Sequence, residues 1–146
     1  IEQRLPGLLR EAAAGDLPLT LVMVDVDRFK LFNEAHGPSL GDEVLRAVAN
    51  CLKDMTRYHD IVARLGGEEF AIVAPNMDLE VLSRFAERIR KAVASQTIAA
   101  GNVRLKVTAS VGIAVWDRRE SMDELYRRAD SRLYEAKRQG RNRICA

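Results

Sequence analysis

The stretch at residues 61–74, IVARLGGEEFAIVA, decides the fold because it reads as a complete β-hairpin. Two apolar runs flank the pair Gly66 and Gly67, and such a pair is a strong signal for a tight turn. Glycine lacks a Cβ atom, so it adopts positive φ angles and lets a ligand approach the main chain. Glu68 and Glu69 follow the glycines, so the turn carries two carboxylates to the edge of a sheet. The alternative is a plain hairpin whose acids are merely solvated.

A second group of acids follows the strand that is expected upstream of this hairpin. Residues 17–24 form an apolar, β-branched run that is typical of a buried strand, and the run ends at Asp25 and Asp27. In a strand–helix–hairpin unit the first strand lies beside the second hairpin strand, so carboxylates of both can meet at one edge. Two or three carboxylates with a backbone carbonyl suit Mg²⁺, and two-metal nucleotidyl transfer needs such an arrangement.

Periodicity in the rest of the chain completes the expected topology. The expected helices cover residues 5–15, about 28–35, about 40–55, 79–94 and 121–140, and the further strands cover residues 103–108 and 110–116. Ser39 with Asp42, and Ser121 with Glu124, resemble capping pairs at helix starts. The order β-α-α-β-β-α-β-β-α predicts an α+β fold with a split βαβ core and with helices on one side of the sheet.

Composition narrows the class of protein. The chain has 146 residues, of which 47% are hydrophobic and 30% charged, and this suits one soluble domain. No apolar run reaches the roughly 20 residues of a membrane helix, and the net charge of +2 gives no reason to expect a nucleic-acid partner. Cys51, Cys145, His36 and His59 show no metal-ligand or disulfide spacing, so we expect a reducing, cytoplasmic location. Because the chain begins with Ile1, we expect an excised piece of a longer protein, whose missing part can include a membrane anchor.

Five blocks of the sequence, in register, resemble the GGDEF family of diguanylate cyclases. The string RLGGEEF at residues 64–70 is similar to the family's signature. The other blocks are residues 25–30 with Asn33, residues 41–45, residues 129–137 and residues 140–143. The resemblance extends from about residue 19 to residue 143, which is nearly the whole chain.

Two positions depart from the family's pattern. Gly37 and Pro38 stand where the family usually has Gly-His, and Glu34 stands where Asp is usual. Proline fixes φ and removes a backbone donor, so we expect an altered loop with activity retained.

The resemblance implies a fold and an activity. Residues 17–146 would form a diguanylate cyclase domain with a ferredoxin-like, palm-type fold, in which helices flank a central antiparallel sheet. Residues 1–16 would be a linker helix from an upstream sensor or regulatory domain. Two GTP molecules would be joined into cyclic di-GMP, with release of pyrophosphate, when the 3′-hydroxyl of one attacks the α-phosphate of the other across a homodimer. Two Mg²⁺ or Mn²⁺ ions per half-site would assist the reaction.

The resemblance also implies roles for individual residues. The metal would be bound by the carboxylates of Asp25, Glu68 and Glu69 and by the backbone carbonyl of Val26. Glu69 can instead help to deprotonate the attacking hydroxyl. The catalytic residues would be Glu68, Glu69, Arg64 and Lys30. The substrate would contact Phe29, Lys30, Asn33, Asp42, Gly67, Lys137 and Arg141.

Within the substrate site, Asn33 and Asp42 would bind guanine, because adenine lacks the N1–H and 2-amino donors that an acidic side chain accepts. Helix capping is the alternative for Asp42, and Asn33 can instead merely end the short helix before it. A favourable interaction with the helix dipole is the alternative for Lys137 and Arg141.

A separate site would bind the product and inhibit the enzyme. It would comprise Arg57, Asp60, Arg84 and Arg88. Arginine can grip a guanine edge or a phosphate with two parallel hydrogen bonds, and aspartate can accept from guanine. The alternative is a surface ion pair between Arg57 and Asp60 and two solvated arginines.

Three other functions compete with this interpretation. A non-catalytic receptor for GTP or cyclic di-GMP would be expected to have a damaged GGEEF string or a lost metal acid, and neither is seen. Another palm-type nucleotidyl enzyme would share the metal acids but need not carry Asn33, Asp42 or the pair Arg57 and Asp60. A dimerisation or scaffold module would show no turnover.

Overall fold

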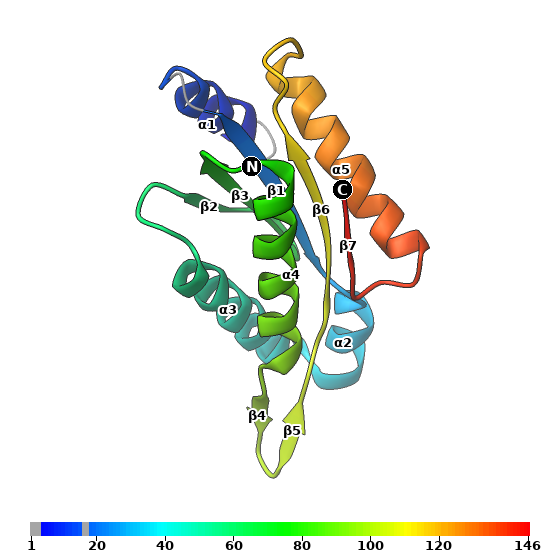
Figure 1. The fold of residues 1–146 in the computed structure, drawn as a ribbon. Helices are drawn as coiled ribbons and strands as arrows, with labels where there is room; N and C mark the ends of the chain where they lie inside the picture. Colours follow the sequence, from blue (N-terminus) through cyan, green and yellow to red (C-terminus); the bar gives the residue numbers. More distant parts are fainter. Residues whose placement is uncertain (1–3, 16–17) are drawn as a thin grey trace.

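A five-stranded mixed sheet forms the centre of the structure (Figure 1), a computed structural model that describes residues 4–15 and 18–146. Its strand order is β2-β3-β1-β6-β7. The strands are β1 (Leu19–Val26), β2 (Ile61–Gly66), β3 (Glu69–Pro75), β6 (Ala109–Val115) and β7 (Ile144–Cys145). β1 lies at the centre, antiparallel to both β3 and β6, and all of its residues are buried. The predicted start of this strand, Leu17, lies outside the described residues.

Four of the five helices in the described chain pack on the two faces of this sheet, the short helix after β1 packs against the helix that follows it, and a small hairpin extends away from the sheet (Figure 1). The helices are α1 (Arg4–Ala13), α2 (Phe29–His36), α3 (Pro38–Met55), α4 (Leu79–Ser95) and α5 (Met122–Arg138). The hairpin consists of β4 (Ile98–Ala100) and β5 (Val103–Leu105). None of the helices in the described ranges combines the length and the apolar character that crossing a bilayer requires.

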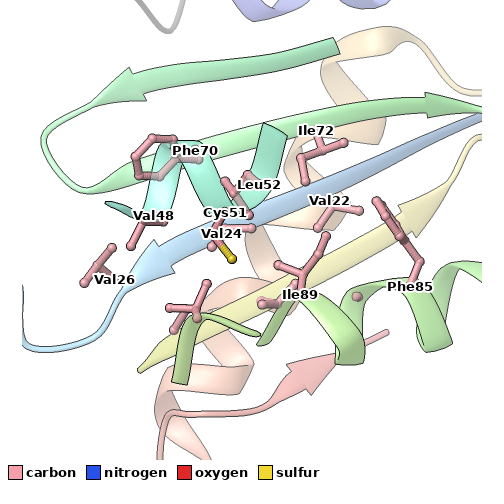
Figure 2. Close-up of a cluster of buried hydrophobic side chains, with 14 of the residues drawn as sticks. Val22, Val24, Val26, Val48, Cys51, Leu52, Phe70, Ile72, Phe85 and Ile89 are labelled. Carbon is pink, nitrogen blue, oxygen red and sulfur yellow. The ribbon is translucent and has the colours of Figure 1, made fainter. Parts of the chain in front are cut away.

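The predicted placement of helices on one side of the sheet is wrong, because two hydrophobic cores lie on opposite faces. Alternate residues of β1, namely Val22, Val24 and Val26, belong to the core with α3 and α4 (Figure 2). Leu21 and Met23 belong to the second core, with α1 and α5. A continuous apolar strand is the expected signature of burial on both faces, so the sequence already contained the signal for helices on both sides.

Short or locally irregular elements differ from the predictions. The sheet is antiparallel except for β7, which was missed and pairs in parallel with β6. The predicted strand at residues 103–108 is reduced to β5, which pairs with the unpredicted β4. The predicted cap formed by Ser39 and Asp42 is wrong, since α3 begins at Pro38 after Gly37 and has no side-chain cap. Proline suits this first helical position, where its missing N–H costs no intrahelical bond.

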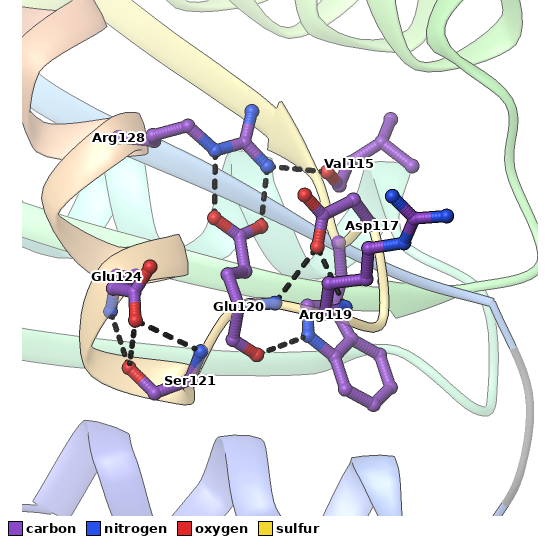
Figure 3. A network of polar contacts seen from close by, with 8 residues as sticks. Val115, Asp117, Arg119, Glu120, Ser121, Glu124 and Arg128 are labelled. Atoms are coloured by element: carbon purple, nitrogen blue, oxygen red, sulfur yellow. Dashed lines mark hydrogen bonds and ion pairs between the residues drawn. The ribbon is translucent and has the colours of Figure 1, made fainter.

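The start of α5 is anchored to the end of β6 by a polar network (Figure 3). The predicted capping box is confirmed, since the Ser121 hydroxyl accepts from the Glu124 N–H at 3.2 Å and the Glu124 carboxylate accepts from the Ser121 N–H. The carboxylate of Glu120, which precedes the helix, accepts a hydrogen bond from Arg128 of α5. Arg128 also donates to the Val115 carbonyl at the end of β6. These contacts fix the direction in which α5 crosses the sheet.

The middle of α5 packs directly on β6 at Gly112. A Cβ atom at Gly112 would lie 2.2 Å from the Leu133 nitrogen and 2.3 Å from the Ala129 carbonyl oxygen. Both atoms belong to the helix backbone, so neither can move without shifting α5. Only glycine permits this approach, which brings the last turn of α5 to the end of β1.

We predict that Gly112→Ala lowers the free energy of unfolding by about 1–3 kcal/mol, because overpacking against the backbone displaces α5. Thermal unfolding of the parent protein and of the Gly112→Ala variant measures the change. Gly7→Ala is the matched control, since no atom lies within 4 Å of a Cβ at that position on α1. That substitution should be neutral or stabilising, because alanine favours a helix over glycine. A Gly112→Ala protein as stable as the parent would contradict the packing described for α5.

Candidate active site at the end of the central strand

Strand pairing brings the predicted acids to one edge of the sheet. In the ladder of β1 and β3, Asp25 lies opposite Glu69. The Val26 N–H donates to the Glu68 carbonyl oxygen at 3.2 Å, which ties the hairpin turn to the end of β1. Gly67 lies in this turn with φ at 50°, a conformation that favours glycine. The register therefore places these acids beside one another, as expected from the sequence.

A lysine from α5 enters this group of acids. The Lys137 ammonium lies 2.5 Å from Asp25 Oδ2, and the Asp25 side chain is only 4% exposed. Lys137 was predicted to bind the triphosphate, and the helix dipole was the alternative. In this structure Lys137 is the counter-charge of Asp25, and its role toward a triphosphate stays a prediction.

One lysine does not balance the negative charge at this edge. Burial raises the pKa of Asp25 above its ordinary value, and the charges of Glu68 and Asp27 raise it further, although Lys137 acts in the opposite direction. Burial is also the main reason that the pKa of Glu69 is raised, and the charge of Asp25 adds to it. Additional positive charge would therefore be stabilised at this site.

The acids at this edge suit a divalent ion that takes some of its ligands from the protein and the others from a substrate. In residues 4–15 and 18–146, no three His, Cys, Asp or Glu side chains lie close enough together to hold a metal ion. The protein therefore does not form a closed metal cage here. Mg²⁺ is commonly bound by one or two carboxylates, waters and substrate phosphates. Asp25 and the acids after the double glycine are suited to this kind of site.

Asn33, which was predicted to contact guanine, has an unusual environment between α2 and α3. Its Oδ1 atom is buried and has no hydrogen-bond partner in the described structure. A Cβ atom at Gly41 would lie 1.8 Å from this oxygen, so Gly41 provides the space for the amide. A buried acceptor without a partner is costly, and a ligand that donates a hydrogen bond would relieve that cost.

Asp42 is exposed on α3 and lines a pocket of about 420 Å³ between this helix and the β2–β3 hairpin. The lining residues are Asp42, Leu45, Arg46, Ala49, Lys53, Val62, Arg64 and Phe70. The pocket thus joins a predicted guanine-binding acid to the predicted catalytic Arg64.

Arg64 stabilises the hairpin turn in this structure. Its Nε and Nη2 atoms donate to the Gly67 carbonyl at 3.1 and 2.8 Å. The guanidinium therefore holds the turn that carries Glu68 and Glu69. This contact was not predicted, although the two residues are only three positions apart in the sequence.

Two predicted substrate contacts at the start of α2 have different environments. Phe29 is 9% exposed and packs in the core beneath the helix, whereas Lys30 is exposed. The Phe29 side chain is therefore mainly a structural support for α2. Lys30 is accessible to a ligand.

Asp27, to which the sequence analysis gave no role, connects the end of β1 to the loop after α5. Its carboxylate accepts hydrogen bonds from Thr108 Oγ1 at 2.7 Å, from Ser110 Oγ at 2.6 Å and from the Asn142 N–H at 3.0 Å. Arg141, a predicted triphosphate ligand, precedes Asn142 in this loop. The available signal was the two-position spacing of Asp25 and Asp27, which puts Asp27, just beyond the end of β1, on the same face of the chain as Asp25.

Asp130 was missed as a neighbour of the site. Its charge contributes to the raised pKa of Glu69. Asp130 lies seven residues before Lys137, so both occur on one face of α5. That spacing was the available signal in the sequence.

The residues of the predicted product site contact their own neighbours. The backbone N–H and the guanidinium of Arg57 donate to Asp60, and Arg57 Nη2 donates to the Pro75 carbonyl at 2.7 Å. Arg84 lies 3.8 Å from Glu80. The Arg88 guanidinium lies 6.0 Å from the centre of a phenylalanine ring on the same helix. The ion pair considered as an alternative is thus present, and half of the Arg57 side chain stays exposed.

Comparison with known sequences connects this chain to one family. The family described as "Diguanylate cyclase, GGDEF domain" matches residues 1–143. Diguanylate cyclase DgcM of Escherichia coli K12 is 43% identical over 141 residues, which is 97% of this chain and 33% of that protein. Response regulator PleD of Caulobacter vibrioides is 38% identical over 144 residues, covering 97% of this chain and 32% of PleD. The chain thus spans about a third of the length of these relatives.

Solved structures show the same fold. The GGDEF domain of DgcB from Caulobacter crescentus, in complex with c-di-GMP, has a TM-score of 0.89 at 35% identity, covering 99% of this chain and 86% of that one. The active GGEEF domain of a diguanylate cyclase from Vibrio cholerae has a TM-score of 0.85 at 33% identity, covering 99% and 92%. The predicted α+β, palm-type architecture is therefore confirmed. Since the family match extends over nearly the whole sequence, the chain belongs to the GGDEF family of diguanylate cyclase domains.

Proposed function

We propose that this domain condenses two GTP molecules into cyclic di-GMP and pyrophosphate. The observation that carries the proposal is the buried, incompletely neutralised group of acids at the end of β1, where the pKa values of Asp25 and Glu69 are raised. Such a site favours a divalent cation and the phosphates that accompany it. Relatives that are named diguanylate cyclases support the choice of reaction.

Asp25, Glu68, Glu69 and the Val26 carbonyl would form the metal site, which would hold two Mg²⁺ or Mn²⁺ ions per half-site. When bound, these ions supply Lewis-acid chemistry, which lowers the pKa of the attacking 3′-hydroxyl and stabilises charge on the phosphate. Alternatively, Glu69 would accept the proton of the attacking hydroxyl instead of binding metal.

The guanine base is recognised by Asn33 and Asp42. The Asn33 amide oxygen is buried without a partner in this structure, and rotation of the side chain toward the base would give it a hydrogen-bond donor. The exposed Asp42 carboxylate accepts from the N1–H and the 2-amino group. Adenine lacks these donors, so ATP would leave both acceptors unpaired.

The phosphates are bound by basic residues around the acids. Lys137 neutralises Asp25 in this structure and becomes available to a phosphate once Asp25 has another counter-charge. Lys30 and Arg141 complete the triphosphate site, and Arg64 stabilises charge that develops on the α-phosphate.

The product has two-fold symmetry, so two domains must face one another and each supplies half of the site. We therefore propose a catalytic homodimer. Its formation is proposed to be controlled by an upstream sensor or regulatory domain through residues 1–16, which include α1. The cytoplasmic location expected from the sequence is part of this proposal.

The same product is proposed to inhibit the enzyme by binding to Arg57, Asp60, Arg84 and Arg88. The exposed half of the Arg57 side chain can grip a guanine edge or a phosphate, while Asp60 keeps it oriented. Arg84 and Arg88, four residues apart on α4, provide further positive charge on one helix face.

A forced dimer incubated with GTP and Mg²⁺ should form cyclic di-GMP, and the same protein should form no product from ATP. Chromatographic separation of the nucleotides measures both. We expect Asp25→Asn to lower the rate about 100-fold or more, since metal-bound charge stabilisation amounts to several kcal/mol. Asp54→Asn, at an exposed position of α3, serves as the control and should retain activity. A forced dimer that binds GTP without forming product would indicate a receptor module instead.

Arg57→Ala should weaken inhibition by cyclic di-GMP about 10-fold or more, because charge-assisted hydrogen bonds contribute about 1.5–3 kcal/mol each. The initial rate should be largely unchanged. The inhibition constant is measured from initial rates at increasing product concentration, and thermal unfolding checks that the lost contact with Pro75 has not unfolded the domain. Arg127→Ala, an exposed arginine on α5, is the matched control. Inhibition of equal strength in the Arg57 variant would contradict the proposed product site.

A further inference from the structure

The loop after α5 holds Arg141 in a backbone conformation that arginine does not favour, between a glycine and an asparagine that accept it. Gly140, Arg141 and Asn142 have φ angles of 125°, 65° and 49°. Arginine in the left-handed region is uncommon, and such conformations persist where the surroundings impose them. Something outside the loop must therefore hold it in place.

Backbone hydrogen bonds close this loop on α5 and β6, since the Arg141 N–H donates to the Ala136 carbonyl oxygen at 3.0 Å and the Val111 N–H donates to the Arg143 carbonyl oxygen at 2.9 Å. Asn142 adds two contacts that tie the loop to the end of β1 and to α4. Its backbone N–H donates to Asp27 Oδ2 at 3.0 Å, and its side-chain Oδ1 accepts from Arg90 Nη1 at 2.7 Å. Asp27 is 7% exposed and is itself fixed by two hydroxyl donors, so it forms a rigid anchor at the end of β1. The loop is thus attached to the strand that carries Asp25.

The second anchor, Arg90 on α4, is also held in place by a residue of its own helix. Its Nε and Nη2 atoms donate to the Glu87 carboxylate at 2.6 and 2.8 Å, and its side chain is 16% exposed. This pairing raises the pKa of Arg90 and lowers the pKa of Glu87, so both groups stay charged. One nitrogen, Nη1, remains directed at Asn142.

The two anchors, Asp27 and Arg90, both contact Asn142, which follows Arg141 in the sequence. The two aspartates at the end of β1 have different partners in the C-terminal segment, since Asp25 pairs with Lys137 and Asp27 holds Asn142. We infer that Asn142 is a positioning residue, which is clamped by Arg90 and Asp27 and thereby fixes Arg141 for the triphosphate. The inference rests on the proposed function, because it takes Arg141 as a phosphate ligand. It adds Asn142, Arg90 and Asp27, none of which received a substrate role above.

The test compares two substitutions at Asn142. Asn142→Gly removes Oδ1 but retains the N–H and suits the left-handed backbone, so it isolates the contact with Arg90. Asn142→Asp retains an oxygen acceptor for Arg90 and also tolerates this backbone. The readout is the affinity for a GTP analogue with a methylene bridge between the α- and β-phosphates, measured by calorimetry with Mg²⁺. Thermal unfolding is recorded for every variant.

We expect Asn142→Gly to weaken binding of the analogue about 3- to 10-fold, as the loss of one hydrogen bond predicts. Asn142→Asp should restore the affinity to near that of the parent. Arg141→Ala should also weaken binding. In the Arg141→Ala background, Asn142→Gly should have little further effect, because a residue that acts only through Arg141 is coupled to it.

Several results would overturn the inference. Parental affinity in Asn142→Gly, no rescue by Asn142→Asp, or a full additional loss in the Arg141→Ala background would each do so. If Arg141→Ala weakens binding while Asn142→Gly does not, only the positioning role fails. If Arg141→Ala leaves binding unchanged, the triphosphate assignment in the proposed function fails as well.

Discussion

The register between β1 and β3 is the constraint on which the candidate site depends. It sets Asp25 opposite Glu69 and brings the hairpin turn to the end of β1. A shift by one residue would turn every side chain of β1 to the other face. On one face of β1 valines enter the first core, and on the other face larger residues such as Leu21 and Met23 enter the second core. A shifted strand would put side chains of the wrong size into both cores, so burial on both faces fixes the register. The hydrophobic cores therefore place the carboxylates.

The acids at this edge reduce the stability of the fold that positions them. Because burial and mutual repulsion raise the pKa values of Asp25 and Glu69, the folded chain binds protons more tightly than the unfolded chain. The free energy of unfolding then falls as pH rises through the raised pKa values. Lys137 offsets part of this effect. The close packing of α5 on Gly112 and the network at the start of α5 hold that lysine in place.

Features set by local sequence could be predicted, and those set by distant contacts could not. The hairpin, the central strand and the capping box of α5 follow from turn residues, an apolar run and a four-residue motif. β7 has only two residues, which is too short to show periodicity. The start of α3 is set by Pro38 at the first helical position and not by a capping side chain. The pairing of Lys137 with Asp25 spans 112 positions, and that of Asn142 with Asp27 spans 115. Family resemblance identified Lys137 as a site residue, whereas its partner became visible only in the folded chain.

The central claim is that the end of β1 is a buried site short of positive charge. Carboxyl resonances of Asp25 and Glu69, followed by NMR during a pH titration, test it most directly. Without divalent ions, both pKa values should lie above the ordinary values of 3.8 and 4.5. Addition of Mg²⁺ with a non-hydrolysable GTP analogue should lower both, because bound positive charge favours the ionised carboxylates. Ordinary pKa values in the free protein, unchanged when Mg²⁺ and the analogue are added, would contradict the account.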